Sequence, residues 1–118
     1  MSRYHNIEVD ELAWMINKNI IDAIIDVRPK KVFYKGHIKK SRNFPCRQFE
    51  NYLPNIFDFI ESGVSKIVVI SEGNKEDNSI VYNALSRSGY SDIVFVNFNI
   101  SDWKDVGGVV KYGNESHD

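Results

Sequence analysis

Residues 26–45 read DVRPKKVFYKGHIKKSRNFP, and this stretch decides the fold. It starts at the end of an apolar, β-branched run, AIIDV at residues 23–27, which has the composition of a buried strand. Two further runs have the same character, KIVVI at residues 66–70 and IVFV at residues 93–96. Strands of this composition belong to sheets that helices cover on each side, so the three segments predict the centre of a parallel sheet.

Amphipathic patterns predict helices between the strands. In the first pattern, Asp10 is placed to cap a helix whose apolar face carries Leu12, Met15 and Ile16. The second pattern has apolar residues at spacings of three and four, namely Phe49, Leu53, Phe57 and Ile60. Pro54 lies inside it, so this residue either starts the helix or kinks it.

A third amphipathic pattern precedes the last predicted strand. Its apolar residues are Ile80, Val81, Ala84 and Leu85. Gly89 follows at the position where a left-handed C-terminal cap is expected. Strands that alternate with helices at this spacing predict the α/β class, with a largely parallel sheet.

The bulk composition is that of a globular domain. At 118 residues the chain has the size of one domain, which we assign to residues 1–112, and the polar tail at residues 113–118 is expected to fray. Apolar residues make up 42% of the chain, and no apolar run is long enough to span a bilayer. The N-terminus lacks the apolar segment of a secretion signal, and one cysteine cannot form an internal disulfide. These features favour a reducing, cytoplasmic setting.

The net charge of −1 conceals an uneven distribution of charges. Residues 27–49 carry no acid, while their basic residues number eight: Arg28, Lys30, Lys31, Lys35, Lys39, Lys40, Arg42 and Arg47. All sixteen acids lie outside this stretch, so we expect a basic patch on an otherwise acidic domain. A solvated surface is the simplest interpretation, and docking to an acidic protein is the functional one. The pI of about 6.3 and the lack of a recognised binding motif argue against nucleic acid.

The motif in residues 26–45 resembles that of the rhodanese family. The matching positions are Asp26, Val27, Arg28, Phe33, Gly36, His37, Ile38, Asn43, Phe44 and Pro45. Leu85, Gly89, Tyr90 and Trp103 extend the resemblance toward the end of the chain. It implies a rhodanese-like α/β domain with a central parallel sheet of about five strands and helices on both faces. Asp26 and Arg28 are then expected to brace the turn after the strand, and Phe33 and Phe44 to lie in the core.

The same resemblance implies a catalytic cysteine after the strand at residues 66–70, where this chain has Ser71. The active-site-equivalent loop is expected to run directly into a helix and to comprise Ser71, Glu72, Gly73, Asn74, Lys75, Glu76, Asp77 and Asn78. The family loop ends near an arginine, which is absent here, and the loop charges sum to −2. A serine hydroxyl is not ionised at neutral pH and cannot form a persulfide, so the hydroxyl lacks the nucleophilicity of a thiolate.

Two further departures surround this loop. The family has a pair of glycines where this chain has Phe98 and Asn99, and we expect these larger side chains to crowd the pocket. Val32 replaces the family's glutamate before Phe33, which is expected to remove an ion pair with Arg28. Neither departure favours sulfur transfer.

Two residues are alternative candidates for chemistry. His37 has the side chain of an acid or base, but in this motif it is expected to pack and hydrogen-bond at the sheet edge. Cys46 precedes Arg47, whose charge could lower the pKa of the thiol, although the motif places this cysteine in a different loop. No Cys or His cluster surrounds Cys46, so we predict neither a metal nor another cofactor.

The leading hypothesis is a binding or regulatory module without sulfurtransferase activity. Its partner is expected to be a protein, bound either at the acidic loop of residues 71–78 or at the basic residues 27–49. The first alternative is a weak sulfurtransferase or persulfide carrier that uses Cys46. The second is an anion site at a helix N-terminus after Asn78, which the acidic loop disfavours. No pattern in the sequence indicates an oligomeric state.

Overall fold

The computed structural model describes residues 4–114, and its centre is a five-stranded sheet with the order β1-β6-β5-β2-β4. The strands are β1 (His5–Ile7), β2 (Ala23–Asp26), β4 (Arg42–Asn43), β5 (Lys66–Ser71) and β6 (Asp92–Asn97). Every pairing in this sheet is parallel, which confirms the predicted fold class. A small antiparallel sheet joins β3 (His37–Ile38) to β7 (Val110–Lys111), and the sequence did not indicate it.

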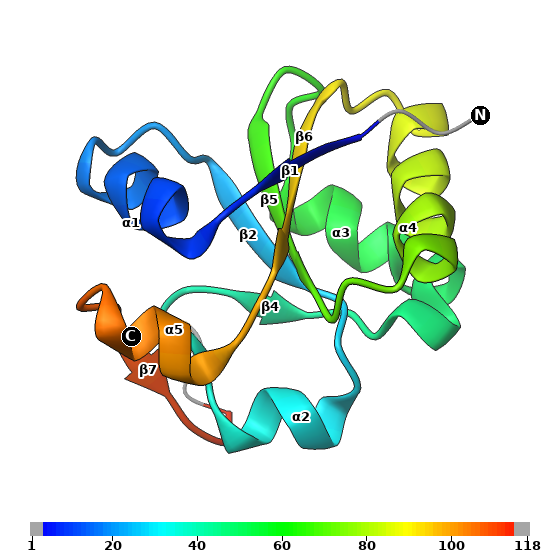
Figure 1. Cartoon of the computed structure of the whole chain (residues 1–118). Coiled ribbons are helices and arrows are strands. Elements are labelled where there is room, and N and C mark those ends of the chain that lie inside the picture. The colour runs from blue at the N-terminus through cyan, green and yellow to red at the C-terminus, as the bar shows by residue number, and fades with distance from the viewer. Residues whose placement is uncertain (1–3, 115–118) are drawn as a thin grey trace.

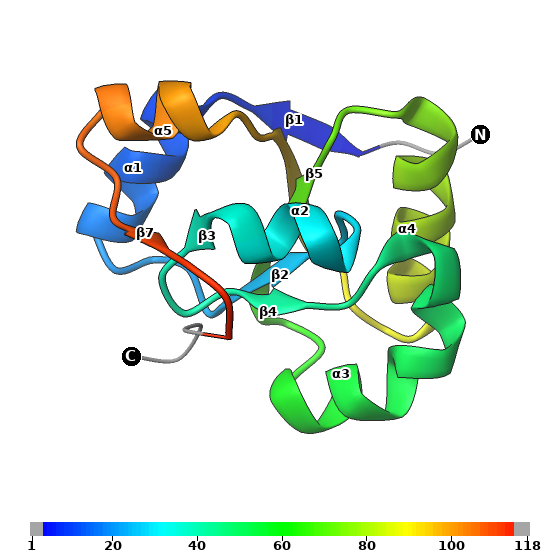
Figure 2. The same cartoon turned by 90° about the horizontal axis from the view of Figure 1, so that it is seen from below.

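Helices cover both faces of the central sheet (Figure 1). One face carries α1 (Val9–Asn17) and α5 (Ile100–Asp105). The other carries the 3₁₀-helix η1 (Cys46–Tyr52), α3 (Leu53–Phe59) and α4 (Lys75–Arg87). The short helix α2 (Lys30–Lys35) lies below the sheet in Figure 1 and in front of it in Figure 2, at the edge where β2 and β5 end.

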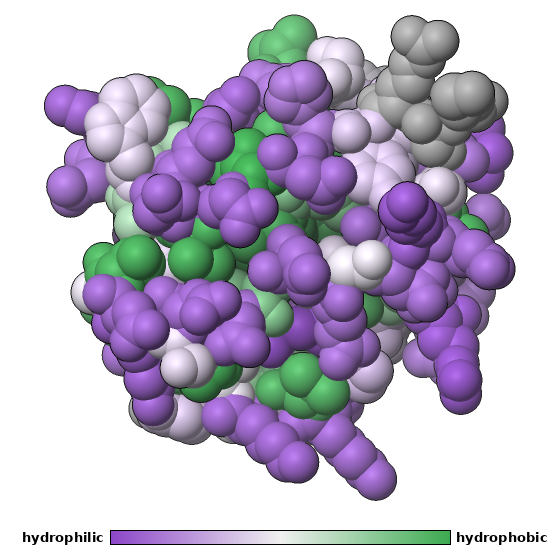
Figure 3. All heavy atoms as spheres, in the orientation of Figure 1, coloured by the Kyte–Doolittle hydropathy of each residue, from purple (hydrophilic) through white to green (hydrophobic). Residues whose placement is uncertain are grey.

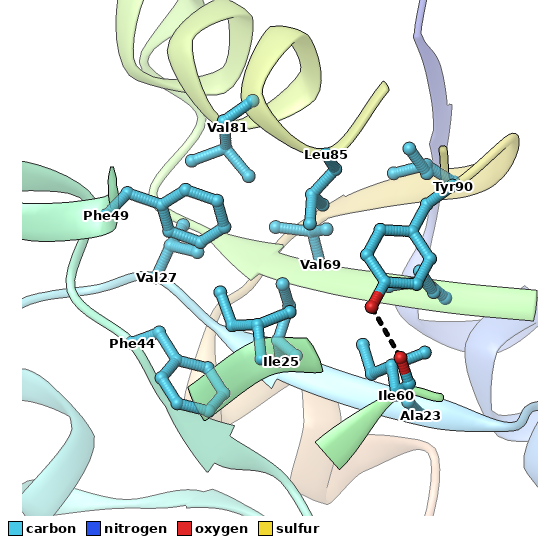
Figure 4. Packing of buried hydrophobic residues seen from close by; sticks show 14 of the residues in the cluster. Ala23, Ile25, Val27, Phe44, Phe49, Ile60, Val69, Val81, Leu85 and Tyr90 are labelled. Carbon is cyan, nitrogen blue, oxygen red and sulfur yellow. Dashed lines mark hydrogen bonds between the residues drawn. The ribbon is translucent and has the colours of Figure 1, made fainter. Parts of the chain in front are cut away.

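Each face of the sheet has its own apolar core, because consecutive strand residues point to opposite sides. Val69 of β5 packs toward α4, where Val81 and Leu85 meet it, and Phe49 of η1 closes the same cluster (Figure 4). The neighbouring Val68 packs instead with Leu12 of α1. Phe33 and Phe44 are both buried, as predicted, and so is Trp103.

Helix boundaries differ from the prediction in their details. Asp10 does not cap α1, which starts at Val9, and its carboxylate instead accepts a hydrogen bond from the Glu11 amide. Pro54 starts α3 rather than kinking it, because a proline is tolerated in the first turn of a helix. Gly89 follows α4 with a φ of 101°, which confirms the predicted left-handed position.

Three apolar positions predicted on buried helix faces are exposed. They are Ile16, Phe57 and Ile80. Hydrophilic side chains also project from the lower margin of the molecule, where α2 lies (Figure 3). Within residues 4–114, no helix is both long enough and apolar enough to cross a membrane.

Candidate functional site

A cleft of about 980 Å³ opens at the carboxyl edge of the central sheet. Its walls come from residues 27–30 after β2, from residues 45–52 after β4, and from the β5–α4 turn, which begins at Ser71. The carboxyl ends of neighbouring parallel strands meet at this edge, which is where open α/β sheets bind their ligands. Residues 71–78 and residues 27–49, which the sequence predicted as two alternative binding surfaces, therefore both contribute to one cleft.

A buried ion pair between Asp26 and Arg28 lies where residues 27–30 line the cleft, and we call this part of the site the floor. Arg28 Nη2 lies 2.7 Å from Asp26 Oδ2, and Arg28 Nε donates to Oδ1 at 2.9 Å. The two side chains are only 4% and 0% exposed. Burial raises the pKa of Asp26, and the hydrogen bonds and charge of Arg28 oppose that rise. Arg28 therefore keeps a countercharge in Asp26, although Val32 stands where the family has a glutamate.

Other residues of the family motif hold this floor together. Asn43 Nδ2 donates to the carbonyl oxygens of both Asp26 and Arg28, at 2.9 Å each. Arg28 Nη2 also donates to the carbonyl of Gly36 at 2.9 Å. A Cβ atom at Gly36 would lie 2.4 Å from Ile100, so only glycine fits there. Arg28 is thus buried and bonded, and it has to be removed from the predicted basic patch.

His37 lies outside the cleft. Its ring stacks on Phe33 with the centroids 3.7 Å apart, and its Nδ1 lies 2.8 Å from the Phe33 carbonyl oxygen. The ring is fully buried. His37 therefore packs against α2 and cannot contact a ligand in the cleft. Pro45, which belongs to the same motif, does line the cleft.

The turn between β5 and α4 is shorter than the predicted loop. Ser71 is the last residue of β5, and its Oγ accepts a hydrogen bond from the Gly73 amide at 3.2 Å. Gly73 has a φ of +85°, and a Cβ atom there would lie 2.8 Å from Asn97. The helix already begins at Lys75, because the Asn74 side chain caps it by accepting from the Asp77 amide at 3.0 Å.

This early start corrects two predictions. Residues 75–78 form the first turn of α4 and not a loop, and no helix N-terminus follows Asn78. Ser71 is 2% exposed and holds the turn through its hydroxyl. Asn74 was predicted as a loop residue, and its role as the cap of α4 was missed. The signal was present, since an asparagine followed within three positions by Glu76 and Asp77 is typical of a helix start.

Asn78 is the least satisfied polar side chain at this site. It lines the cleft and is only 3% exposed. Its Oδ1 is the one buried side-chain oxygen or nitrogen of the described residues without a hydrogen-bond partner. Because buried polar groups are nearly always paired, this acceptor marks a place where a water or a ligand can donate a hydrogen bond.

Cys46 also lines the cleft, although it follows a different strand from Ser71. Its amide donates to the Val27 carbonyl at 2.9 Å, and its thiol donates to the Asp77 carbonyl at 3.6 Å. Burial, with the negative charge of Asp77 adding to it, raises the pKa of the thiol to about 11. The expected lowering of the thiol pKa by Arg47 is therefore wrong. Cys46 does lie in a different loop from Ser71, as expected, and both loops line one cleft.

The charges of the cleft are divided between its walls. Lys30 and Arg47 lie on the walls after β2 and β4, and Glu72 and Asp77 lie on the β5–α4 wall. Across residues 4–114 these four side chains make no ion pair within 4.0 Å. Glu50 also lines the wall after β4 and pairs with Arg87 at 3.6 Å, so that wall carries both charges, while the β5–α4 wall carries carboxylates alone.

Phe98 and Asn99 do not crowd the cleft, contrary to the prediction. Phe98 is buried beneath Arg28, whose guanidinium carbon lies 4.8 Å from the centre of its ring. Asn99 caps α5 by accepting from the Ser101 amide at 2.8 Å. Both side chains therefore serve the fold.

No metal site is evident at the cleft or elsewhere in the described part of the chain. No group of three His, Cys, Asp or Glu side chains between residues 4 and 114 comes close enough to hold an ion.

The sheet and the cleft together define an α/β domain with an open cleft, formed by the loops after three neighbouring parallel strands.

Comparison with known proteins gives the family. The model of the rhodanese-like domain matches residues 8–105, and the chain belongs to this family. No curated protein sequence matches the chain. A rhodanese-related protein from Thermoplasma volcanium is 26% identical, with a TM-score of 0.64 over 92% of this chain and 98% of that one.

Two other solved structures share the fold at lower identity. The Alr3790 protein from Anabaena sp. is 18% identical, with a TM-score of 0.69 over 92% of this chain and 93% of that one. A thiosulfate sulfurtransferase from Pseudomonas aeruginosa is 19% identical, with a TM-score of 0.72 over 92% of this chain and 20% of the enzyme. At this level the comparisons establish the fold, and the chemistry has to be argued from the cleft.

Proposed function

We propose that this protein is a binding module that does not transfer sulfur and that recognises a protein partner at the cleft. The observation that carries the proposal is Ser71, which stands at the end of β5 where the family resemblance implies a cysteine. Its hydroxyl accepts a hydrogen bond from the Gly73 amide and, unlike a cysteine thiol, is not ionised at neutral pH. Sulfur transfer needs a thiolate that takes sulfur from a donor and carries it as a persulfide.

The charge of the β5–α4 wall supports the same proposal. Glu72 and Asp77 line the cleft, and no arginine lies on this turn. Thiosulfate is a dianion, so it would meet like charge at the place where sulfurtransferase chemistry needs cations. The buried Arg28 cannot supply that charge, because its guanidinium already bonds Asp26 and Gly36.

The partner is proposed to be an acidic protein that contacts the basic surface beside the cleft. This surface comprises Lys30, Lys31, Lys35, Lys39, Lys40, Arg42 and Arg47, all exposed. None of these seven forms an ion pair with a described residue, so their charges are free to steer an acidic surface.

A second candidate function is a persulfide carrier that uses Cys46. The observation that favours it is the position of Cys46, which lines the same cleft as Ser71. The thiol pKa of about 11 weighs against it, because roughly one thiol in ten thousand is ionised at pH 7.

The deciding experiment is transfer of sulfur from thiosulfate to cyanide, with mass spectrometry for a persulfide on the same samples. We expect neither thiocyanate nor a persulfide from the natural protein. Ser71→Cys and Cys46→Ala proteins serve as comparisons. Activity that disappears in Cys46→Ala would overturn the proposal in favour of the carrier.

Partner chemistry is tested with a fluorescent poly-glutamate peptide. We expect binding that weakens with salt and that is lost when Lys31 and Lys35 are both changed to glutamate. Lys18→Glu with Lys104→Glu is the matched control, since both lysines are exposed, Lys18 directly after α1 and Lys104 within α5. Equal loss in both double variants would show a general charge effect and no docking surface.

A further inference from the structure

The β5–α4 wall combines two features that point to one kind of ligand. The first is the orphan Oδ1 of Asn78, which can only accept a hydrogen bond. The second is a pair of carboxylates on the same wall, Glu72 and Asp77, neither of which forms an ion pair with a described residue. An acceptor beside two negative charges is suited to a group that both donates hydrogen bonds and carries a positive charge.

We propose that this wall is a cation subsite, which binds the guanidinium or ammonium group of a basic side chain presented by the partner protein. The proposal rests on the binding function proposed above and names the chemistry recognised at that wall. It reverses the preference that the family resemblance implies for this position, where an anionic donor meets a thiolate and an arginine.

Among residues 4–114, no basic side chain forms an ion pair with the carboxylates of this subsite. Arg28 is bonded to Asp26 and Gly36, and Lys30 and Arg47 stand on the other walls. Lys75 belongs to the same helical turn but does not line the cleft. A basic side chain from outside therefore has no competitor at Asn78 and Asp77 among the residues that line the cleft.

The positive end of α4 does not oppose this ligand strongly. Asn74 already bonds one amide of the first turn, and Glu76 and Asp77 place two carboxylates beside the helix N-terminus. These charges offset the partial positive charge of the exposed amides. An arginine is the best fit, because its planar group offers five donors and keeps its charge when partly buried.

The test is an NMR titration of the uniformly ¹⁵N-labelled protein with four probes. Methylguanidinium has charge and donors, tetramethylammonium has charge alone, urea has donors alone, and phosphate is an anion. We expect saturable shifts of the Gly73, Asp77 and Asn78 amides with methylguanidinium and much weaker shifts with the others. Phosphate shifts at these amides, without an effect of methylguanidinium, would overturn the proposal.

Two variants and a control locate the effect. Glu72→Gln combined with Asp77→Asn should weaken methylguanidinium binding by at least about tenfold, and Asn78→Leu by a smaller factor. Glu8→Gln combined with Glu61→Gln removes two exposed acids outside the cleft and should leave binding unchanged. The dispersion of each spectrum shows directly whether a variant is folded. Binding that survives in both cleft variants would also reject the subsite.

A last comparison separates a protein side chain from a small molecule. We expect a capped Gly-Arg-Gly peptide to bind at least as tightly as free arginine. Tighter binding of free arginine would mean that its carboxylate meets Lys30 or Arg47, and the occupant would then be a zwitterionic metabolite. Failure of these titrations leaves the sulfur-transfer result untouched, so the two proposals can fail separately.

Discussion

The floor of the cleft keeps the family motif, whereas the β5–α4 wall departs from it. Beneath the cleft, Asp26, Arg28 and Asn43 match the motif and are joined by hydrogen bonds. On the β5–α4 wall, Ser71 replaces the expected cysteine, and Asn78 is left with an unpaired oxygen. The difference indicates that the motif in residues 26–45 holds the fold, while the turn at which the resemblance places the chemistry can change without unfolding the domain.

We expect the largest loss of stability from a substitution in the floor. Asp26→Asn leaves the guanidinium of Arg28 buried without a countercharge, which should lower the free energy of unfolding by about 3–5 kcal/mol. Urea unfolding followed by circular dichroism measures it. Asp92→Asn is the matched control, because its pair with Lys66 is partly exposed and should be worth less than about 1 kcal/mol. Similar losses in the two variants would mean that the buried pair does not hold the floor.

The second effect concerns Cys46, which connects the two regions. With a thiol pKa of about 11 in the folded protein and 9.0 as the ordinary value, alkylation by iodoacetamide at pH 8 should be about 100-fold slower in the folded than in the urea-unfolded protein. The thiol is protonated below its pKa, so the folded-state rate should rise about tenfold per pH unit up to pH 11. Mass spectrometry follows the reaction. A rate that levels off near pH 7 would show an available thiolate and restore the persulfide carrier.

Sequence reasoning captured the floor better than the wall, and the reason is physical. The strands at residues 23–27 and 66–70 were predicted because burial on both faces leaves a continuous apolar run. Gly89 was predicted because a left-handed cap follows a simple local rule. These signals are local, so each can be identified from a few neighbouring residues.

The wall depended on contacts between distant segments. Cys46 lies beside Asp77, which is 31 positions away in the sequence. The sequence neighbour Arg47 therefore suggested a lowered thiol pKa, whereas burial and Asp77 raise it. Phe98 looked like an obstruction until the structure placed its ring beneath Arg28. The start of α4 was the exception, because the Asn74 cap was a local signal that competed with the expected length of the family loop.

The third prediction tests that cap. Asn74→Ala removes the acceptor for the Asp77 amide and should lower the free energy of unfolding by about 1 kcal/mol. Asn99→Ala is the matched control, because Asn99 caps α5 in the same way. Hydrogen exchange should accelerate at residues 75–78 in the first variant alone. Unchanged exchange there would mean that the cap does not determine where α4 begins.

The smallest effect has the opposite sign, and it sharpens the contrast between floor and wall. A buried acceptor without a partner destabilises the fold, so Asn78→Leu should raise the free energy of unfolding by roughly 0.5 kcal/mol beyond any gain from helix propensity. Ser86→Leu, at an exposed position of the same helix, measures the propensity gain alone. A more stable Asn78→Leu protein that no longer binds methylguanidinium would show stability given up for recognition. A less stable Asn78→Leu protein would mean that the Asn78 side chain has a hydrogen-bond partner such as a bound water. The polar groups of the wall would then all be hydrogen-bonded, as those of the floor are.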